Sequence, residues 1–333
     1  MNGTPTNSTP GSSPYVASVV IATRNRAVNL RKCIACLQTM VQVNGRWEIV
    51  VVDNNSTDET AVVVREAEAA GGQAEVRYLF EGRRGKSAAL NAGISHARGS
   101  VVAFTDDDCL PDSLWLKNVL DLFDADPDLA VLGGRVELFD ARDKNFSIIR
   151  CEQQLEIPPS RILKALFGTM EEIDRYGSVI GANSAVRRSV FAKIGMFDVF
   201  LALGATRQPM CSEDSDFVYR ACRAGLKVLY SPAPLVYHNH GRRTDEDLQS
   251  VTKTYTRGRG AFYFKHSLSG DIPVLKMAYW EIKDYILGLL SLKLGPAKRK
   301  NFRRVMGFLF YGMSTQVKAL GRDRVGRSVH LSS

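Results

Sequence analysis

Three adjacent carboxylates, Asp106, Asp107 and Asp108, stand at the end of an apolar run in the 333-residue sequence and could carry chemistry. They follow the apolar run SVVAFT, which is typical of a buried strand. Adjacent carboxylates raise one another's pKa unless a cation or several N–H donors satisfy them. A hard divalent ion, which takes carboxylate and phosphate oxygens, is a natural partner. The alternative is a solvated acidic turn, and the position at a strand end favours the metal ion.

Glu213, Asp214 and Asp216 form a second acidic group, at the start of a helix predicted over residues 212–224. Negative charge there complements the helix dipole, but one or two acids would suffice. A carboxylate beside a substrate site can accept the proton of an attacking hydroxyl. Helix capping and catalysis both remain open for this group.

Two histidines, His238 and His240, stand at alternate positions near the end of a predicted strand. Alternate residues of a strand point to the same side, so both imidazoles can face one metal site. One buried, hydrogen-bonded histidine and one exposed histidine is the alternative. The pair Cys33 and Cys36 lies inside an amphipathic helix without a second pair at zinc spacing, which disfavours metal or redox chemistry.

The loop GRRGKS at residues 82–87 is basic and precedes a predicted helix. Phe80 stands where a Walker motif requires glycine, so the loop is not a P-loop. A flexible basic loop before a helix N-terminus still suits a diphosphate.

The elements that position these groups alternate between strands and helices. Apolar runs predict strands at residues 15–22, 47–53, 75–80, 100–106 and 129–139, with helices between most of them. Such alternation predicts βαβ units, a mostly parallel sheet and an α/β fold. Ligands bind beyond the carboxyl ends of such strands. The polar segments at those ends are Thr23–Arg26, Asp53–Asn55, Glu81–Lys86 and Asp106–Asp108.

Beyond residue 140 the pattern is less regular. A helix is expected near residues 187–194, and VLYSPAPLVYHNHG predicts a strand, a proline-marked turn and a second strand.

Composition is that of a globular protein, with 45% hydrophobic and 24% charged residues. No stretch approaches the roughly 18 apolar residues of a membrane span. Six cysteines are too few for a disulfide scaffold, so we expect reduced thiols in a cytoplasmic protein.

The net charge of +9 is concentrated at the C-terminus. From Lys253 onward there are 16 Lys and Arg against 4 Asp and Glu. Residues 297–320 have the pattern of a basic amphipathic helix, which either lies on an anionic membrane surface or packs on the rest of the protein. Nucleic acid is a disfavoured partner, because no aromatic–basic stacking module accompanies the charge.

Taken in order, these segments resemble the inverting family 2 glycosyltransferases of the GT-A fold over residues 15–245. VVIATRNR is similar to that family's first strand and nucleotide loop, VVDNNSTDET to its second-strand motif, and GKSAALNAGISHARGSVVAFTDDDCLPD to the stretch with the DXD motif. GANSAVRRSVFAKIGMFD resembles the acceptor-side segment, SEDSDFVYRACRAG the motif with the catalytic base, and VYHNHG the later histidine.

The resemblance implies a nucleotide-sugar site. It comprises Thr23 and Arg26 lining the base pocket, Asp53 on the base, Asp106 on the ribose, Lys86 and Asn91 at the diphosphate or ribose, and Asn55 and Asp107 beside them. Asp108 and His238, which is preferred to His240, would bind Mn²⁺ or Mg²⁺, and this ion would neutralise the diphosphate leaving group.

The resemblance also implies how the reaction proceeds. Asp214 would deprotonate the acceptor hydroxyl for in-line attack with inversion at the anomeric carbon, and Glu213 would help to place the acceptor. The acceptor side also includes Asn183 and Asp216. GKSAALN has Leu90 where many members have arginine, a variant that resembles the processive polysaccharide synthases. Because the QXXRW motif and membrane spans of those synthases are missing, the sequence predicts transfer of a single sugar.

The expected organisation is a flexible tail (1–14), a GT-A domain (15–250) with a nucleotide-binding part (15–140) and an acceptor-binding part (141–250), and a basic helical C-terminal extension (251–333). The expected acceptor is a glycan or lipid-linked glycan, with the enzyme peripheral on the inner face of the plasma membrane. A sugar nucleotidyltransferase is one alternative, although TRNR at 23–26 lacks the glycine that its loop needs. A non-catalytic nucleotide-sugar or membrane-binding module is the other.

Overall fold

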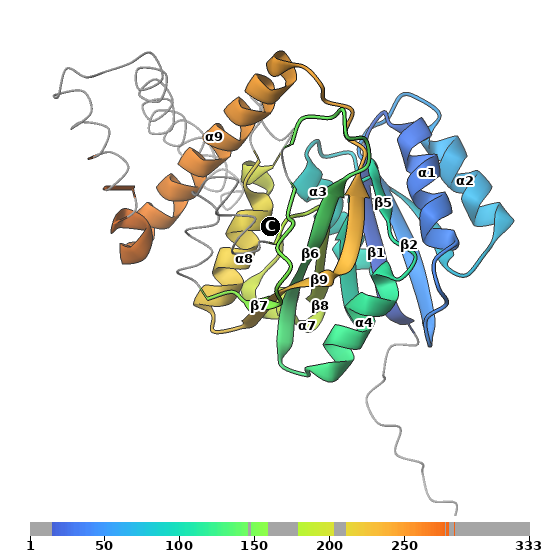
Figure 1. Ribbon diagram of the computed structural model, residues 1–333, viewed down its shortest axis with the longest axis horizontal. Helices are drawn as coiled ribbons and strands as arrows, with labels where there is room; N and C mark the ends of the chain where they lie inside the picture. Colours follow the sequence, from blue (N-terminus) through green and yellow to red (C-terminus); the bar gives the residue numbers. More distant parts are fainter. Residues whose placement is uncertain are drawn as a thin grey trace, which may run out of the picture.

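A single mixed β-sheet forms the centre of the protein, as seen in a computed structural model that describes residues 15–145, 148–158, 179–202, 211–276, 278–279 and 283 (Figure 1). The strand order is β3-β2-β1-β4-β8-β6-β9-β5, and β7 pairs with β9. The strands are β1 (Tyr15–Thr23), β2 (Arg46–Asp53), β3 (Glu75–Phe80), β4 (Val101–Thr105), β5 (Cys109–Pro111), β6 (Leu129–Leu138), β7 (Leu155–Glu156), β8 (Asn183–Arg187) and β9 (Lys227–His238). The helices are α1 (Ala27–Gln38), α2 (Thr60–Ala70), α3 (Lys86–His96), α4 (Trp115–Ala125), α7 (Ser189–Ile194), the 3₁₀ turn η1 (Val199–Leu201), α8 (Glu213–Arg223) and α9 (Asp245–Leu268).

The first half of the chain forms the parallel part of the sheet. β3, β2, β1 and β4 pair in parallel, as the apolar runs predicted. Alternate residues of these strands face two separate cores. Val20 and Val50 pack with α3 and α8 on one face, whereas Ile21 and Val51 pack with α1, α2 and α4 on the other. Helices on both faces leave the carboxyl ends of the strands as the open edge, and the predicted α/β fold is confirmed.

The later strands extend the same sheet. β8 pairs antiparallel with both β4 and β6, and β6 pairs in parallel with β9. The nucleotide-binding and acceptor-binding parts expected from the sequence therefore contribute strands to one sheet. This arrangement brings the end of β9 close to the end of β4, because β5 follows the three carboxylates and pairs with β9.

The prediction of two strands with a turn in VLYSPAPLVYHNHG was wrong, because Lys227–His238 form the single strand β9. The pairing with β6 jumps from Gly134–Ser231 to Arg135–Leu235. Proline has no backbone N–H to donate to a neighbouring strand, so the segment with Pro232 and Pro234 bulges out of the ladder and pairing resumes after it.

The long helix α9 starts at a capping box. Thr244 accepts a hydrogen bond from the Asp247 amide, and the Asp247 side chain accepts from the Thr244 amide.

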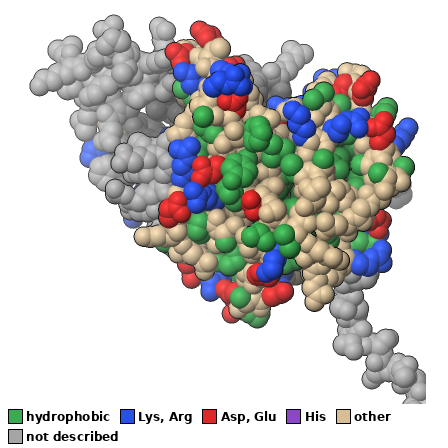
Figure 2. Space-filling model, turned by 45° about the vertical axis from the view of Figure 1, so that its right-hand side comes forward, with side chains coloured by type: hydrophobic (Ala, Val, Ile, Leu, Met, Phe, Trp, Pro, Cys, Tyr) green, Lys and Arg blue, Asp and Glu red, His purple; other side chains and the backbone are tan. Residues whose placement is uncertain are grey.

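None of the helices in the described ranges combines the length and hydropathy needed to cross a bilayer. The face in Figure 2 has basic and acidic side chains interspersed around its edge. The predicted tail (1–14) and basic helix (297–320) lie outside the described residues.

Candidate active site

A pocket of about 560 Å³ opens at the carboxyl edge of the sheet. Seven of the predicted site residues line it, and they are Thr23, Arg26, Lys86, Asp106, Asp107, Asp108 and His238. They come from the ends of β1, β4 and β9 and from the start of α3. The sheet topology therefore gathers residues that are more than 200 positions apart in the chain.

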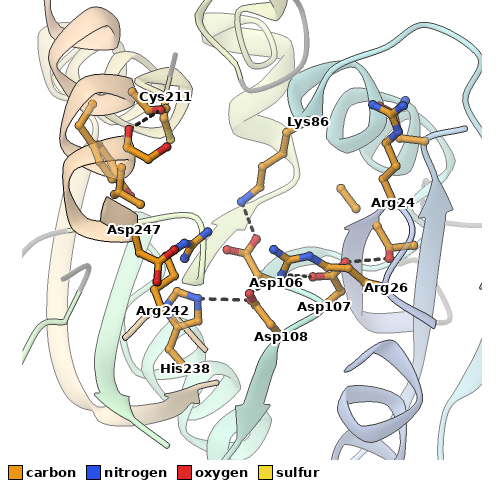
Figure 3. A pocket seen from close by; sticks show the side chains of 17 residues that line it. Arg24, Arg26, Lys86, Asp106, Asp107, Asp108, Cys211, His238, Arg242 and Asp247 are labelled. Carbon is orange, nitrogen blue, oxygen red and sulfur yellow. Dashed lines mark hydrogen bonds and ion pairs between the residues drawn. The ribbon is translucent and has the colours of Figure 1, made fainter. Parts of the chain in front are cut away.

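Each of the three adjacent carboxylates has its own partners (Figure 3). Lys86 Nζ lies 2.5 Å from Asp106 Oδ1. Thr23 Oγ1 donates to Asp107 Oδ2 at 2.7 Å, and Arg26 Nη1 lies 3.3 Å from Asp107 Oδ1. Asp108 accepts a hydrogen bond from Arg26. Hydrogen-bond donors and cations thus offset the mutual repulsion of the three carboxylates that the sequence predicted.

The pocket perturbs the titration of these groups. Burial raises the pKa of Asp107 to about 6, although Arg26 opposes the shift. Burial acts in the same sense on Asp108, but the contacts with His238 and Arg26 hold its pKa below the usual range. Burial disfavours the charged form of Lys86, yet the neighbouring Asp106 and Glu213 keep the pKa of Lys86 well above its ordinary value. At neutral pH Asp108 and Lys86 are therefore both charged.

Asp108 and His238 form a suitable pair of metal ligands. Cys109 pairs with His238 across β5 and β9, which brings His238 Nε2 to 3.3 Å from Asp108 Oδ1. Among the described residues, Asp108, Cys109 and His238 form a group whose ligand atoms lie within 4.8 Å of one another. Burial raises the pKa of the Cys109 thiol well above its usual value, so the useful donors are one carboxylate and one imidazole. Oxygen and nitrogen donors fit Mn²⁺ well, and the Arg26 guanidinium against Asp108 indicates that this position accepts a cation.

His240 is oriented differently from His238. Its buried Nδ1 lies 3.6 Å from Asp143 Oδ2 and accepts a hydrogen bond from the Arg242 amide at 3.0 Å. The rings of His240 and His238 are in edge-to-face contact with centroids 5.0 Å apart. The geometry therefore favours His238 as the ligand, with His240 packed behind it.

The second acidic group lies at the start of α8, next to Lys86. The Gly181 amide donates to Asp214 Oδ2 at 3.2 Å, and a Cβ at Gly181 would lie 3.6 Å from Lys86 Nζ. Glu213 is buried, with Oε1 3.9 Å from Cys211 Sγ. Burial and the adjacent Asp214 raise the pKa of Glu213 to about 7, against the opposing charge of Lys86. Asp214 is the more exposed of the two acids.

The structure places three predicted site residues elsewhere. The side-chain amide of Asn91 exchanges two hydrogen bonds with the backbone of Phe197, so it is not available to a diphosphate. Asn183 is 1% exposed and accepts a hydrogen bond from Trp115 Nε1. Asp216 is fully buried among cations of α8 and α9. The predicted acceptor-side roles of Asn183 and Asp216 are therefore corrected, because both side chains hold the interior together.

Asp53 and Asn55 shape the loops beside the pocket rather than line it. Asp53 accepts from the Ser56 amide and from Tyr78 Oη, each at 2.8 Å. Asn55, at a φ of 65°, donates to the carbonyl oxygens of Glu81 and Gly82. A contact of either side chain with a nucleotide base stays a prediction.

Sequence reasoning missed several residues at the pocket. Asn54 lines it and orders the basic loop, accepting from the Gly85 amide at 2.9 Å and donating to the carbonyl oxygen of Arg83 at 2.8 Å. The sequence marked the segment Asp53–Asn55 as polar residues at a strand end, but Asn54 was not singled out within it. One wall comes from the start of α9 and includes Ser250, Val251, Thr254 and Tyr255. No motif marked this wall, because its residues meet the pocket only through the packing of α9.

The sheet topology, with an acidic pocket at its carboxyl edge, is that of the GT-A fold. The chain belongs to Glycosyl transferase family 2, whose family model matches residues 18–195. It is 34% identical over 124 residues to Glycosyltransferase AglE of Haloferax volcanii, and the match covers 37% of this chain and 40% of that protein. It is 25% identical over 235 residues to the Probable glycosyltransferase YdaM of Bacillus subtilis, and the match covers 66% of this chain and 50% of that protein. The chain thus spans between 40% and 50% of the length of these two relatives.

Solved structures share the fold. The mannosyltransferase PcManGT of Pyrobaculum calidifontis, in complex with GDP-Man and Mn²⁺, matches with a TM-score of 0.55 and 18% identity, over 95% of this chain and 90% of that one. Residues 1–349 of S. aureus TarS, in complex with UDP, match with a TM-score of 0.56 and 15% identity, over 89% and 80% of the two chains. At these identities the likeness concerns the fold.

Proposed function

We propose that this protein transfers one sugar, with inversion, from a nucleoside diphosphate sugar to a hydroxyl of a glycan or lipid-linked glycan. One observation supports this most strongly. The pocket joins Asp108 and His238, which could hold a cation, to Lys86 and Asp106. Lys86 in turn lies near the acidic pair Glu213 and Asp214. A diphosphate bound at Lys86 would then lie between a metal site and a general base. Residues 15–140 would hold the nucleotide and residues 141–250 the acceptor.

The residues of the chain divide the work of the proposed reaction. Lys86 supplies positive charge beside the first amides of α3, where a diphosphate is favourably bound. Asp214 takes the proton of the acceptor hydroxyl as that oxygen attacks the anomeric carbon and the bond to the diphosphate breaks. Asp108 and His238 would hold Mn²⁺ or Mg²⁺, which when bound neutralises the developing charge on the leaving diphosphate. The Mn²⁺ in the complex of PcManGT with GDP-Man supports manganese as the first ion to test.

A donor screen tests the proposed function. The protein is incubated with Mn²⁺, simple glycan acceptors and the common UDP-, GDP-, dTDP- and CDP-sugars, and release of the nucleoside diphosphate is measured. We expect one donor to be consumed. NMR of the product should show that the transferred sugar has the anomeric configuration opposite to the one it had in the donor. Consumption of no donor by folded protein would contradict the proposal, and a product of retained configuration would contradict inversion. Vesicles with a lipid-linked acceptor extend the screen, and stimulation by them would support a membrane role for residues 297–320.

A further inference from the structure

One buried carboxylate joins α8 to α9. Asp216 is fully buried, and its Oδ1 lies 2.7 Å from Lys265 Nζ and 2.9 Å from His266 Nε2. Its Oδ2 lies 2.8 Å from Arg220 Nε on its own helix. Burial alone would raise the pKa of Asp216, but these three partners hold it below the usual range. The carboxylate is therefore ionised, and its ion pairs link α8 to α9.

The network reaches further than the two helices. Lys265 Nζ also lies 2.7 Å from Asp198 Oδ2, just before η1. Arg220 donates to the carbonyl oxygen of Ile194 at the end of α7, and at 2.8 Å to that of Met196. The ion pairs of Asp216 thus connect α7, η1, α8 and α9 on one side of the sheet.

Asp216 stands on the opposite side of α8 from the proposed base. Two positions along a helix correspond to a rotation of about 200°, so Asp214 and Asp216 point in nearly opposite directions. Asp214 contacts the Gly181 amide near Lys86, whereas Asp216 contacts α9. A rotation of the first turn of α8 that released Asp216 would also move the Asp214 carboxylate.

α9 meets the start of α8 at a second place. A Cβ at Gly258 would lie 2.2 Å from the carbonyl oxygen of Cys211, so the backbone of α9 packs directly on the residue that precedes α8 by two positions. Cys211 itself lines the pocket. One turn earlier, Thr254 and Tyr255 of α9 form part of the pocket wall. Figure 1 shows α9 lying against α8 beside the sheet.

We propose that Asp216 is a positioning residue, which with Lys265 and His266 locks the first turn of α8 against α9 and so holds Asp214 in its place at the Gly181 amide, near the pocket residue Lys86. This inference rests on the proposed function, in which Asp214 is the base. It also gives α9 a role in the site, although α9 lies outside residues 18–195, the match to the family model. Asp216 itself touches neither donor nor acceptor.

The test compares Asp216→Asn with a matched variant, Asp271→Asn. Asp271 also links α8 to the end of α9, because both of its oxygens accept from Tyr219 Oη at 2.9 Å. It does so about one turn beyond Asp216, nearer the C-terminal end of α8. Lys265→Gln is a milder third variant, because it leaves Asp216 with His266 and Arg220. Thermal unfolding, donor binding by calorimetry and kcat are measured for all three proteins and the wild type.

We expect Asp216→Asn to lower kcat by about 10- to 100-fold while the donor Kd changes less than about twofold, because a displaced base affects turnover and not ground-state binding. Lys265→Gln should lower kcat by a smaller factor. Asp271→Asn should lower the Tm but leave kcat per folded molecule within about twofold of the wild type. Equal losses of kcat in Asp216→Asn and Asp271→Asn, or an unchanged kcat in Asp216→Asn, would overturn the proposal.

A second readout does not depend on transferase activity. Burial, together with Glu213 and Asp214, raises the pKa of the Cys211 thiol well above its usual value. Alkylation of Cys211 by iodoacetamide, followed by mass spectrometry of its peptide, therefore reports the packing at the start of α8. We expect alkylation to be about fivefold or more faster in Asp216→Asn and unchanged in Asp271→Asn. Should the wild type transfer no sugar, the proposed function fails, and equal alkylation rates in the two variants would separately overturn the positioning role.

Discussion

The guanidinium of Arg26 and the carboxylate of Asp108 form an ion pair at the position where a divalent ion would bind. The carboxylate is 5% exposed, and the arginine side chain is 39% exposed, so only Arg26 has room to leave. A metal ion that binds Asp108 and His238 must compete with this guanidinium. Arg26 therefore acts as a counter-charge that keeps Asp108 ionised without metal.

Replacement of Arg26 by glutamine should strengthen metal binding. Arg26→Gln removes the competing cation, so in the absence of nucleotide we expect Mn²⁺ to bind about tenfold more tightly, a change of ~1.4 kcal/mol. Electron paramagnetic resonance of free Mn²⁺ measures this affinity directly. Arg24→Gln is the control, because Arg24 lines the same pocket. Weaker Mn²⁺ binding in Arg26→Gln than in Arg24→Gln would show that Arg26 does not compete with the ion.

Asp214→Asn should remove the base and keep the donor site. We expect kcat to fall by about 10²- to 10⁴-fold, the usual contribution of a general base, with donor Kd unchanged. Turnover and calorimetric donor binding are measured on the same preparation. Ser215→Ala removes the 3.3 Å hydrogen bond from the Ser215 hydroxyl to Asp214 Oδ1 but keeps the carboxylate, so kcat should stay within about threefold of the wild type. A comparable fall of kcat in both variants would contradict the assignment of the Asp214 carboxylate as the base.

Glu213 should make the stability of the protein depend on pH. Its pKa rises from 4.5 to about 7 on folding, so between these values the folded state binds more protons and the free energy of unfolding falls as pH rises. Glu213→Gln abolishes this fall. We expect the variant to have a Tm higher than the wild type by roughly 3 °C at pH 8, and a similar Tm at pH 4. Exposed Glu246→Gln should give no such difference, and a lower Tm of Glu213→Gln at pH 8 would contradict the raised pKa.

Asn183→Ala should destabilise the fold. Its amide donates to the carbonyl oxygens of Arg135 and Pro234, and its oxygen accepts from Trp115, all in the interior. Loss of these bonds leaves three buried groups unsatisfied, so we expect the free energy of unfolding to drop by about 3 kcal/mol in urea denaturation. Below the unfolding transition the donor Kd should be unchanged. Weakened substrate binding with full stability would restore the acceptor-side role expected from the sequence.

The sequence predicted the parallel half of the sheet well, because buried parallel strands such as Tyr15–Thr23 and Arg46–Asp53 are continuous apolar runs with little ambiguity. It also predicted that Asp106 and Asp108 gather with Lys86, since the carboxyl ends of parallel strands share one edge. The contact of His238 with Asp108 depended on the pairing of β5 with β9, which no local pattern shows.

The errors concern polar residues whose partners are distant in the chain. Asp216 lies in an acidic segment typical of a site, but its partner His266 is 50 residues away. Asn183 likewise bonds to Trp115, which is 68 residues away. A polar side chain that is satisfied by tertiary packing has the same local sequence as one that faces a ligand. Pairing across the sheet and between helices decides which it is.

The most direct test of the account is calorimetric titration of UDP, GDP, dTDP and CDP, each with and without Mn²⁺, into the wild type and Asp108→Ala. Asp121→Ala, which removes an exposed carboxylate of α4, serves as the control. We predict that one nucleotide binds the wild type and the control more tightly with Mn²⁺, and that Asp108→Ala loses this enhancement. Binding of no nucleotide by folded wild type, or an undiminished Mn²⁺ effect in Asp108→Ala, would contradict the assignment of this pocket as a metal-dependent nucleotide-sugar site.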